Sequence, residues 1–189
     1  MRAAALLLAA MQALAQSAAV EGRADSPVRV IIYEDLQCPD CAAFRRMMDD
    51  HLLPRYGAKV AFVHREFPLA KHAWARKAAI AARHFAEVKP ELGIAYRRQT
   101  LATIRETSDA NFAERMVEFA SRRGADPQRA LAALADPRLA QLVEKDFQEG
   151  VARGVARTPT VFVDGKPFIE TFTLEEISKA IDQALAAAQ

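Results

Sequence analysis

The side chains best suited to chemistry in this sequence are Cys38 and Cys41, the only two cysteines among its 189 residues. They form a C-P-D-C motif, and this spacing sets two sulfurs one helical turn apart. Two thiols at that separation can form and break a disulfide. The leading hypothesis is therefore a reversible, redox-active cysteine pair.

Three other interpretations of the C-x-x-C motif are weaker. A structural zinc site needs four ligands, and none of the histidines forms a finger-like pair with this motif. A permanent structural disulfide usually closes a longer loop, because a short ring constrains the unfolded chain little. Chance is disfavoured by the position of the motif between a strand and a helix. We expect no metal and no cofactor. The histidines considered are His51, His64, His72 and His84.

The elements on either side of the motif explain how it would be held. Residues 28–33 (VRVIIY) form an apolar, β-branched run typical of a strand, and the segment after Cys41 has helical spacing that ends near 53–54. Pro39 suits the first helical position, which makes Cys38 the N-cap. Unpaired backbone N–H groups and the helix dipole stabilise a thiolate there. We expect Cys38 to be acidic, exposed and nucleophilic, and Cys41 to be the shielded resolving thiol.

The rest of the chain predicts an α/β domain with a helical insertion. Residues 59–66 read as a second strand, parallel to the first. The pattern is then helical from about 72 to 153, over four or five helices, the last with an apolar stripe through residues 139, 143, 147 and 151. A hairpin at 160–163 and 166–169 and a final helix capped by Thr173 and Glu176 complete the domain.

The N-terminal residues predict export. Residues 1–15 combine a basic start, a short apolar run and a small-residue cleavage pattern, so we expect a signal peptide cut after Ala15, followed by a polar lead over 16–27 and the domain over 28–189. Outside the cytoplasm, in the periplasm or beyond it, a cysteine pair can be held oxidised, which favours disulfide donation.

Composition argues against a nucleic-acid partner. The formal net charge of the whole chain is +2, and no basic cluster is interleaved with aromatic residues. The arginine pairs are interpreted as solvated helix faces. These pairs are Arg45–Arg46, Arg97–Arg98 and Arg122–Arg123.

Taken together, these segments resemble the DsbA-like thiol:disulfide oxidoreductases of the thioredoxin superfamily, over roughly residues 28–188. The resemblance implies a thioredoxin-like fold, in which helices flank a central mixed sheet and an all-helical subdomain is inserted. It also implies that Pro159 is a cis-proline beside the cysteines, and that Thr158 offers its backbone to a substrate peptide. The segments that carry it are YEDLQCPDC (33–41), REFPL with His72 (65–72) and GVARTPT (154–160).

The sequence departs from the family pattern at two positions near the motif. Relatives often carry a buried glutamate six residues before the first cysteine, where this chain has Ile32. Glu34 is a possible substitute, although we expect an exposed acid at the strand end. Arg157 stands where glycine commonly precedes T-P, and its charge would favour the Cys38 thiolate while Asp40 opposes it. His64 and His72 are left off the catalytic set.

The sequence therefore predicts an exported protein disulfide oxidoreductase in which Cys38 and Cys41 are catalytic and Pro39, Asp40, Thr158 and Pro159 support them. Oxidation of protein or peptide thiols is the favoured direction, with a membrane-bound redox partner a candidate to reset the pair, and a monomer is expected. A reductase or isomerase using the same residues, and a noncatalytic periplasmic adaptor or metallochaperone, remain as alternatives.

Overall fold

The computed structural model describes residues 19–188, so the predicted signal peptide lies outside the described residues. Within this range no helix combines the length and the apolar character needed to cross a bilayer. The elements, in chain order, are β1 (Val20–Gly22), β2 (Arg29–Glu34), α2 (Pro39–Met47), the π-helix η1 (Met48–Leu52), α3 (Leu53–Tyr56), β3 (Ala61–Glu66), α4 (Ala75–Val88), α5 (Pro90–Ala102), the 3-10 helix η2 (Ile104–Glu106), α6 (Phe112–Arg122), α7 (Pro127–Ala133), α8 (Pro137–Ala152), β4 (Thr160–Val163), β5 (Lys166–Ile169) and α9 (Leu174–Ala187).

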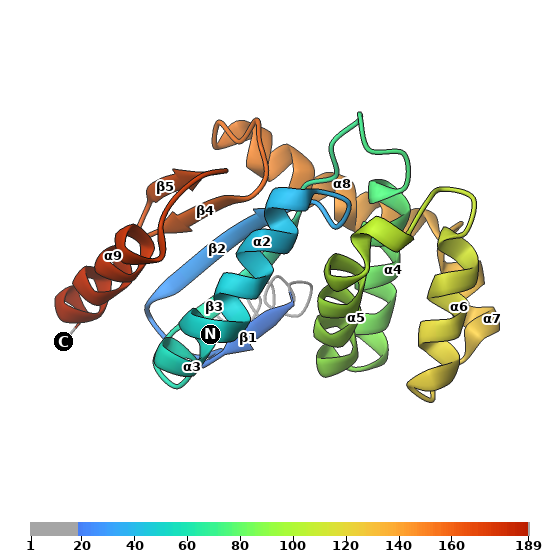
Figure 1. The fold of residues 1–189 in the computed structure, drawn as a ribbon, viewed down its shortest axis with the longest axis horizontal. Helices are drawn as coiled ribbons and strands as arrows, with labels where there is room; N and C mark the ends of the chain where they lie inside the picture. Colours follow the sequence, from blue (N-terminus) through green and yellow to red (C-terminus); the bar gives the residue numbers. More distant parts are fainter. Residues whose placement is uncertain (1–18, 189) are drawn as a thin grey trace, which may run out of the picture.

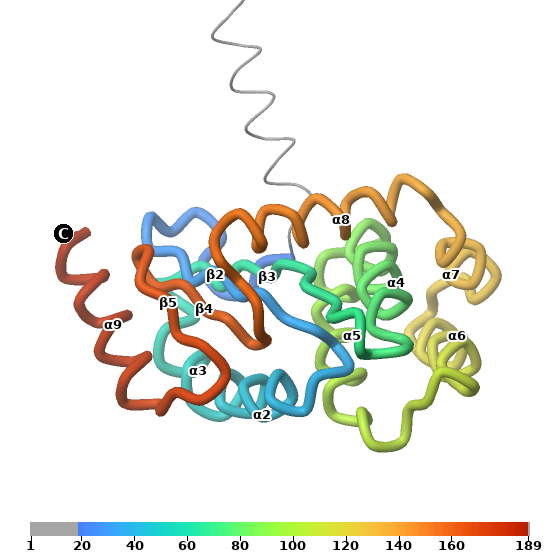
Figure 2. Tube along the Cα trace, turned by 90° about the horizontal axis from the view of Figure 1, so that it is seen from above, coloured from blue at the N-terminus to red at the C-terminus, as the bar shows by residue number. Residues whose placement is uncertain are grey.

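One mixed sheet organises the molecule, with strand order β1-β3-β2-β4-β5. β2 and β3 are parallel, as a strand–helix–strand unit predicts, and all other pairs are antiparallel. Helices α2, α3 and α9 lie on one side of the sheet and α8 crosses the other, while α4 to α7 extend beyond it (Figures 1 and 2). The predicted thioredoxin-like fold with a helical insertion is confirmed.

The edge strand β1 was not predicted, because its residues lie in the segment assigned to a polar lead. It pairs antiparallel with β3, Glu21 lying opposite Phe62. Glu21 is buried there despite its charge. A three-residue strand leaves almost no periodic signal, and its pairing depends on a partner about forty residues away.

The sequence predicted that the helical run carrying the cysteines ends near residues 53–54, but the structure shows a longer run. It continues through η1 into α3, which ends at Tyr56. Pro54 has no N–H to bond to the carbonyl of Asp50, and the backbone N–H of Leu53 instead reaches Met48, five residues back. The π-turn thus accommodates Pro54 without ending the helical run.

The capping box predicted for α9 is observed, formed by Thr173 and Glu176. Asp126 and Asp136 likewise accept hydrogen bonds from the first amides of α7 and α8. In the stripe predicted for α8, Leu139 and Val143 are buried, but Val151 is 47% exposed. The assignment was wrong for Val151, because the buried face of α8 runs through Leu139, Val143, Asp146 and Gly150, and Val151 lies beside that face.

Candidate active site

Cys38 and Cys41 lie where β2 runs into α2, as predicted. Cys38 is the N-cap with extended backbone angles (φ −88°, ψ 124°), Pro39 occupies the first turn, and the Cys38 carbonyl accepts the first helical bond from Ala42 at 3.1 Å. Both cysteines are free thiols in this structure. The local sequence therefore places one sulfur at the open amino end of a helix and the other one turn inside it.

The loop before β4 lies against the first thiol. The Thr158–Pro159 peptide bond is cis, as the family resemblance implied. The Cys38 thiol donates to the Thr158 carbonyl at 3.3 Å. Cys38 is only 5% exposed, which corrects the expectation of an exposed sulfur, because the backbone of Thr158 lies against it.

The two thiols have opposite acidities. A hydrogen bond from Cys41 lowers the pKa of Cys38 to about 6, against the effect of burial, and the Thr158 side chain and the amides of Cys41 and Asp40 contribute to the same direction. Burial raises the pKa of Cys41 well above that of a free thiol, and the Cys38 sulfur raises it further. Near neutral pH the pair is thus a Cys38 thiolate beside a Cys41 thiol.

Asp35 fixes the loop between β2 and the cysteines and was missed as a site residue. Its backbone N–H donates to Cys41 Sγ at 3.4 Å. Its buried carboxylate accepts from the amides of Gln37 (2.7 Å) and Leu69 (2.8 Å) and contacts His72 Nδ1 at 2.8 Å. The bond to an amide two residues on is an Asx-turn, which the D-L-Q segment could have indicated.

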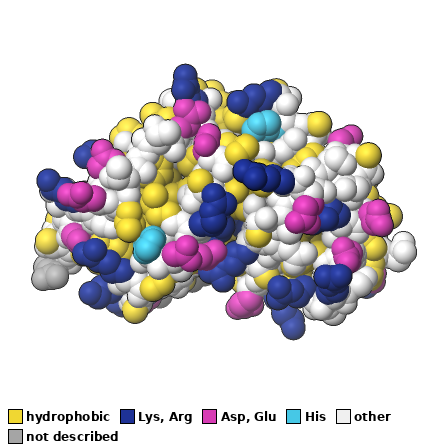
Figure 3. All heavy atoms as spheres, viewed as in Figure 1, with side chains coloured by type: hydrophobic (Ala, Val, Ile, Leu, Met, Phe, Trp, Pro, Cys, Tyr) yellow, Lys and Arg dark blue, Asp and Glu magenta, His cyan; other side chains and the backbone are white. Residues whose placement is uncertain are grey.

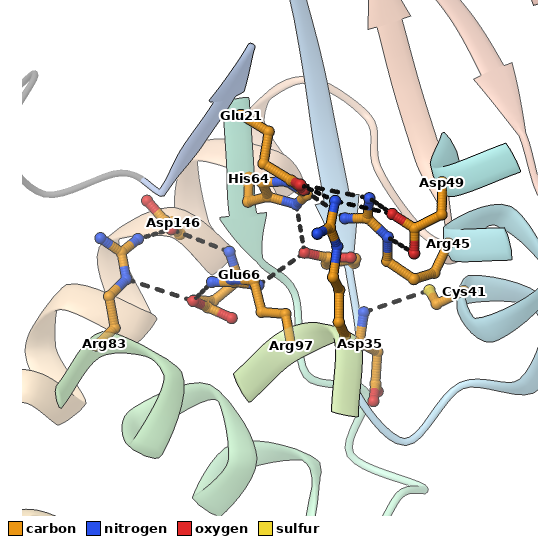
Figure 4. A network of polar contacts seen from close by, with 12 residues as sticks. Glu21, Asp35, Cys41, Arg45, Asp49, His64, Glu66, Arg83, Arg97 and Asp146 are labelled. Carbon is orange, nitrogen blue, oxygen red and sulfur yellow. Dashed lines mark hydrogen bonds and ion pairs between the residues drawn. The ribbon is translucent and has the colours of Figure 1, made fainter. Parts of the chain in front are cut away.

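Glu34 is buried, which corrects the expectation of an exposed acid. It is 3% exposed, and its Oε1 contacts His64 Nδ1 at 2.6 Å and Arg97 Nη1 at 2.7 Å. Both partners are labelled in Figure 4. Burial alone would raise the pKa of Glu34, but the charges of His64 and Arg97 outweigh it and lower the pKa to about 2. Glu34 is therefore a fixed anion and not a proton acceptor at neutral pH.

The other charged residues near the site differ in their burial. Arg157 Nη1 donates to Glu170 at 2.7 Å in an exposed pair, and its effect on the Cys38 thiolate stays a prediction. Arg45 and Arg97 are buried, although both were interpreted as parts of solvated faces. Asp40 is exposed between the cysteines, and Ile32 is core. Within residues 19–188 no group of three or more His, Cys, Asp or Glu side chains is arranged so that it could hold a metal ion.

Comparisons with known proteins agree with this geometry. A family model described as thioredoxin matches residues 15–183. BdbD from Bacillus subtilis, in its oxidised form, has a TM-score of 0.78 and 21% identity, over 90% of this chain and 94% of that one. α-DsbA1 from Wolbachia pipientis has a TM-score of 0.76 and 22% identity, over 90% and 92%.

A curated relative is longer than this chain. It is the Na(+)/H(+) antiporter NhaA 3 of Salinispora tropica, 30% identical over 175 residues, which are 90% of this chain and 25% of the antiporter. The chain spans about a quarter of the length of the curated relatives it matches. The chain belongs to the thioredoxin family, and its fold is that of the DsbA-like thiol:disulfide oxidoreductases.

Proposed function

We propose that this protein exchanges disulfides with protein thiols through Cys38 and Cys41, working outside the cytoplasm as an oxidant. The observation that carries the proposal is the asymmetry of the pair, in which the pKa of Cys38 is lowered to about 6 while that of Cys41 is raised. A pKa that falls from 9 to about 6 favours the reduced form, as the thiolate, by about 1.4 kcal/mol at pH 7 and by more as the pH rises toward 9. A pair with a stable reduced form tends to give its disulfide away.

The reaction follows from this asymmetry. With the pair oxidised, a substrate thiolate attacks Cys38 Sγ, the Cys38–Cys41 bond breaks, and Cys41 leaves with the electron pair and takes up a proton. A second substrate thiolate then attacks its own sulfur in the mixed disulfide, and Cys38 leaves as the stabilised thiolate. The substrate loses two electrons and two thiol protons, and the cysteine pair gains the electrons.

A protein substrate has a surface to contact beside these sulfurs. Hydrophobic side chains gather on the face between α2 and α9, next to the helix that begins at Cys38 (Figure 3). Thr158, within 3.3 Å of Cys38 Sγ, is the backbone we propose for pairing with an extended substrate segment. An unfolded chain with apolar residues fits both features.

The cellular setting is proposed from the sequence. Residues 1–15 direct export, and a membrane-bound partner that removes electrons from Cys38 and Cys41 would restore the disulfide. Such a partner is required by stoichiometry, because each substrate disulfide leaves one reduced pair behind. We propose that the mature protein acts as a monomer.

The decisive measurement is the equilibrium of the pair with reduced and oxidised glutathione. We expect a potential well above that of thioredoxin, about −270 mV, and oxidation of a reduced dithiol peptide by the disulfide form. A potential near the thioredoxin value would assign the protein to reduction or isomerisation instead.

Variants separate an enzyme from a binding protein. We expect Cys38→Ala to abolish peptide oxidation and Cys41→Ala to trap mixed disulfides, while both remain folded. An adaptor or metallochaperone would show no oxidation in the parental protein and would keep its partner in the double variant.

A further inference from the structure

A line of buried charges lies behind Cys41 and is not used in the exchange reaction described above. Glu66 bonds to Arg97, Arg97 to Glu34, Glu34 to His64, and His64 to Glu21 in the edge strand β1 (Figure 4). The line thus joins three neighbouring strands, β2, β3 and β1, with α5. It ends at the sheet edge farthest from the β4–β5 hairpin.

His64 bridges the last two carboxylates of this line, and the geometry of its two contacts favours a protonated ring. Its side chain is fully buried, with Nδ1 at 2.6 Å from Glu34 Oε1 and Nε2 at 2.9 Å from Glu21 Oε1. A neutral imidazole would point one nitrogen lone pair at a carboxylate oxygen, whereas an imidazolium donates from both nitrogens. Burial alone would lower the pKa of His64, but Glu34 and Glu21 outweigh burial and raise it.

Charge balance supports the same protonation state. The buried carboxylates of the cluster are matched by an equal number of buried cations only when His64 is counted as an imidazolium. Two less buried pairs add one cation and one anion each: Arg98 lies 2.8 Å from Glu21 and 2.9 Å from Asp49, and Arg65 lies 3.7 Å from both Asp146 and Glu149. The buried anions are Glu21, Glu34, Glu66 and Asp146, and the buried cations are Arg45, Arg83, Arg97 and His64.

The line reaches the second thiol through Glu34. Glu34 is the last residue of β2, and the N–H of the next residue, Asp35, contacts Cys41 Sγ at 3.4 Å. The charge of Glu34 is one of the causes that raise the pKa of Cys41, after burial and the Cys38 sulfur. Any charge added to or removed from this line therefore acts on the thiolate that Cys41 becomes when it leaves.

We propose that His64 is a positioning residue for Cys41: its positive charge, held between Glu34 and Glu21, offsets the buried carboxylates and lets Cys41 leave as a thiolate. The edge strand β1 is thereby coupled to the cysteine pair through Glu21. The proposal deepens the proposed function and rests on it. It predicts opposite effects of removing a cation and removing an anion from one cluster.

The test uses glutathione as the probe. Its thiolate attacks Cys38 of the oxidised protein, Cys41 leaves with the electron pair, and a second glutathione releases Cys38 and forms glutathione disulfide. The fluorescence of Trp74, the single tryptophan, follows the reaction, since it packs in the same core cluster as both cysteines. We expect His64→Gln to slow the first step about tenfold, because Cys41 becomes a poorer leaving group.

Glu21→Gln tests the remote end of the line. Below pH 7 it leaves an excess positive charge, and we expect the first step to be about threefold faster than in the parental protein. With one carboxylate gone, His64 loses its proton at lower pH, so the ratio of the two rates should fall toward one as pH rises to 8.5. A purely structural role for Glu21 would give a ratio that does not depend on pH.

The matched control is His51→Gln, which removes an exposed histidine from the same helical run as the cysteines. We expect no change in its rate. Equal slowing by His64→Gln and Glu21→Gln, or no effect of either, would overturn the proposal. If His64→Gln does not fold, the rate of Glu21→Gln and its pH profile decide whether the proposal holds.

The test is separate from the test of the proposed function. Because glutathione replaces a protein substrate, failure of peptide oxidation leaves this test intact and counts against the proposed function alone.

Discussion

The sheet is held to its helices in two different ways. Against α2 and α9 it presents aliphatic and aromatic side chains, including Val30, Ile32 and Phe62, which pack on Ile177 and Ile181. Against α4, α5 and the middle of α8, the ends of β2 and β3 present carboxylates. Glu34 and Glu66 meet Arg97 there, and Arg83 and Asp146 continue the contact. We refer to these as the apolar flank and the ionic flank.

The two flanks differ in how strictly each requires particular side chains as partners. Apolar side chains of similar volume can replace one another at modest cost, so the apolar flank contributes stability without demanding particular partners. A buried ion pair contributes little net stability, but removing one partner leaves an uncompensated charge. The ionic flank therefore ties the helical insertion to the sheet in one arrangement, directly behind Cys41.

The largest expected effect is the loss of Arg97. Its guanidinium is 1% exposed and lies between Glu34 and Glu66. Arg97→Ala leaves two buried carboxylates without their cation, and we expect the free energy of unfolding to fall by about 3–5 kcal/mol. Urea denaturation of the reduced protein measures it.

Two substitutions calibrate that result. Arg46→Ala removes an exposed arginine and should change stability by less than about 0.5 kcal/mol. Ile181→Val on the apolar flank should cost about 1 kcal/mol. An Arg97→Ala protein no less stable than the Ile181→Val protein would mean that the two flanks do not differ as described.

The next effect is a loss of stability in acid, which should come from the ionic flank. His64 and Arg97 hold the pKa of Glu34 at about 2, and His64 and Arg45 hold that of Glu21 at about 2, both against burial. A lowered carboxyl pKa contributes stability that is complete above the unfolded value of 4.5 and is lost as pH falls through the folded value. We expect about 2 kcal/mol to be lost per carboxylate between pH 6 and pH 3.

Urea denaturation at pH 6 and pH 3 measures this loss of stability. Two variants show which residues cause it. Ile181→Val should lose as much on acidification as the parental protein, whereas Glu34→Gln should lose less, since it has one of the two titrating groups fewer. Burial raises the pKa of Glu66, which moderates the total. A Glu34→Gln protein with the full acid sensitivity would place the effect elsewhere.

The same division explains what the sequence could and could not predict. Apolar periodicity and local capping identified the helical region over about 72–153 and the final helix α9, because their signals lie within one or two turns of chain. The cis bond at Pro159 came from family resemblance, not from a local rule. The burial of Arg45, Arg97 and His64 was missed because their partners lie 24 to 63 residues away.

A buried charge and a solvated one look alike in a single sequence. Arg45 and Arg97 each stand next to an exposed arginine, and nothing in either dipeptide says which one turns inward. The position of the cysteines at a helix N-terminus, by contrast, depends on Pro39 and a preceding strand, both visible locally. The candidate site was therefore predictable at Cys38 and Cys41, but not in the charges behind them.

The smallest effect tests the cysteine pair apart from both flanks. The Thr158 hydroxyl is buried and has no hydrogen-bond partner within the described residues, which leaves its O–H free to donate to the Cys38 thiolate. Thr158→Val keeps the shape and removes the donor. We expect the pKa of Cys38 to rise from about 6 by about one unit, about 1.4 kcal/mol. At pH 8 the glutathione equilibrium should shift about tenfold toward the disulfide, since the thiolate that stabilises the reduced form is less favoured.

Thiolate absorbance followed against pH measures the first quantity, and Thr171→Val, an exposed threonine in the loop before α9, serves as the control. The direction of the Cys38 pKa shift also determines the pH range in which it stabilises the reduced protein. A lowered thiol pKa stabilises the reduced fold fully above the unfolded value of 9, and this stabilisation is lost as pH falls through about 6. In Thr158→Val this stabilisation should be smaller and should be fully lost at a pH about one unit higher, while the acid sensitivity of the ionic flank stays the same. An unchanged Cys38 pKa would instead assign its acidity to Cys41 and the helix amides, of which the sequence alone predicted only the amides.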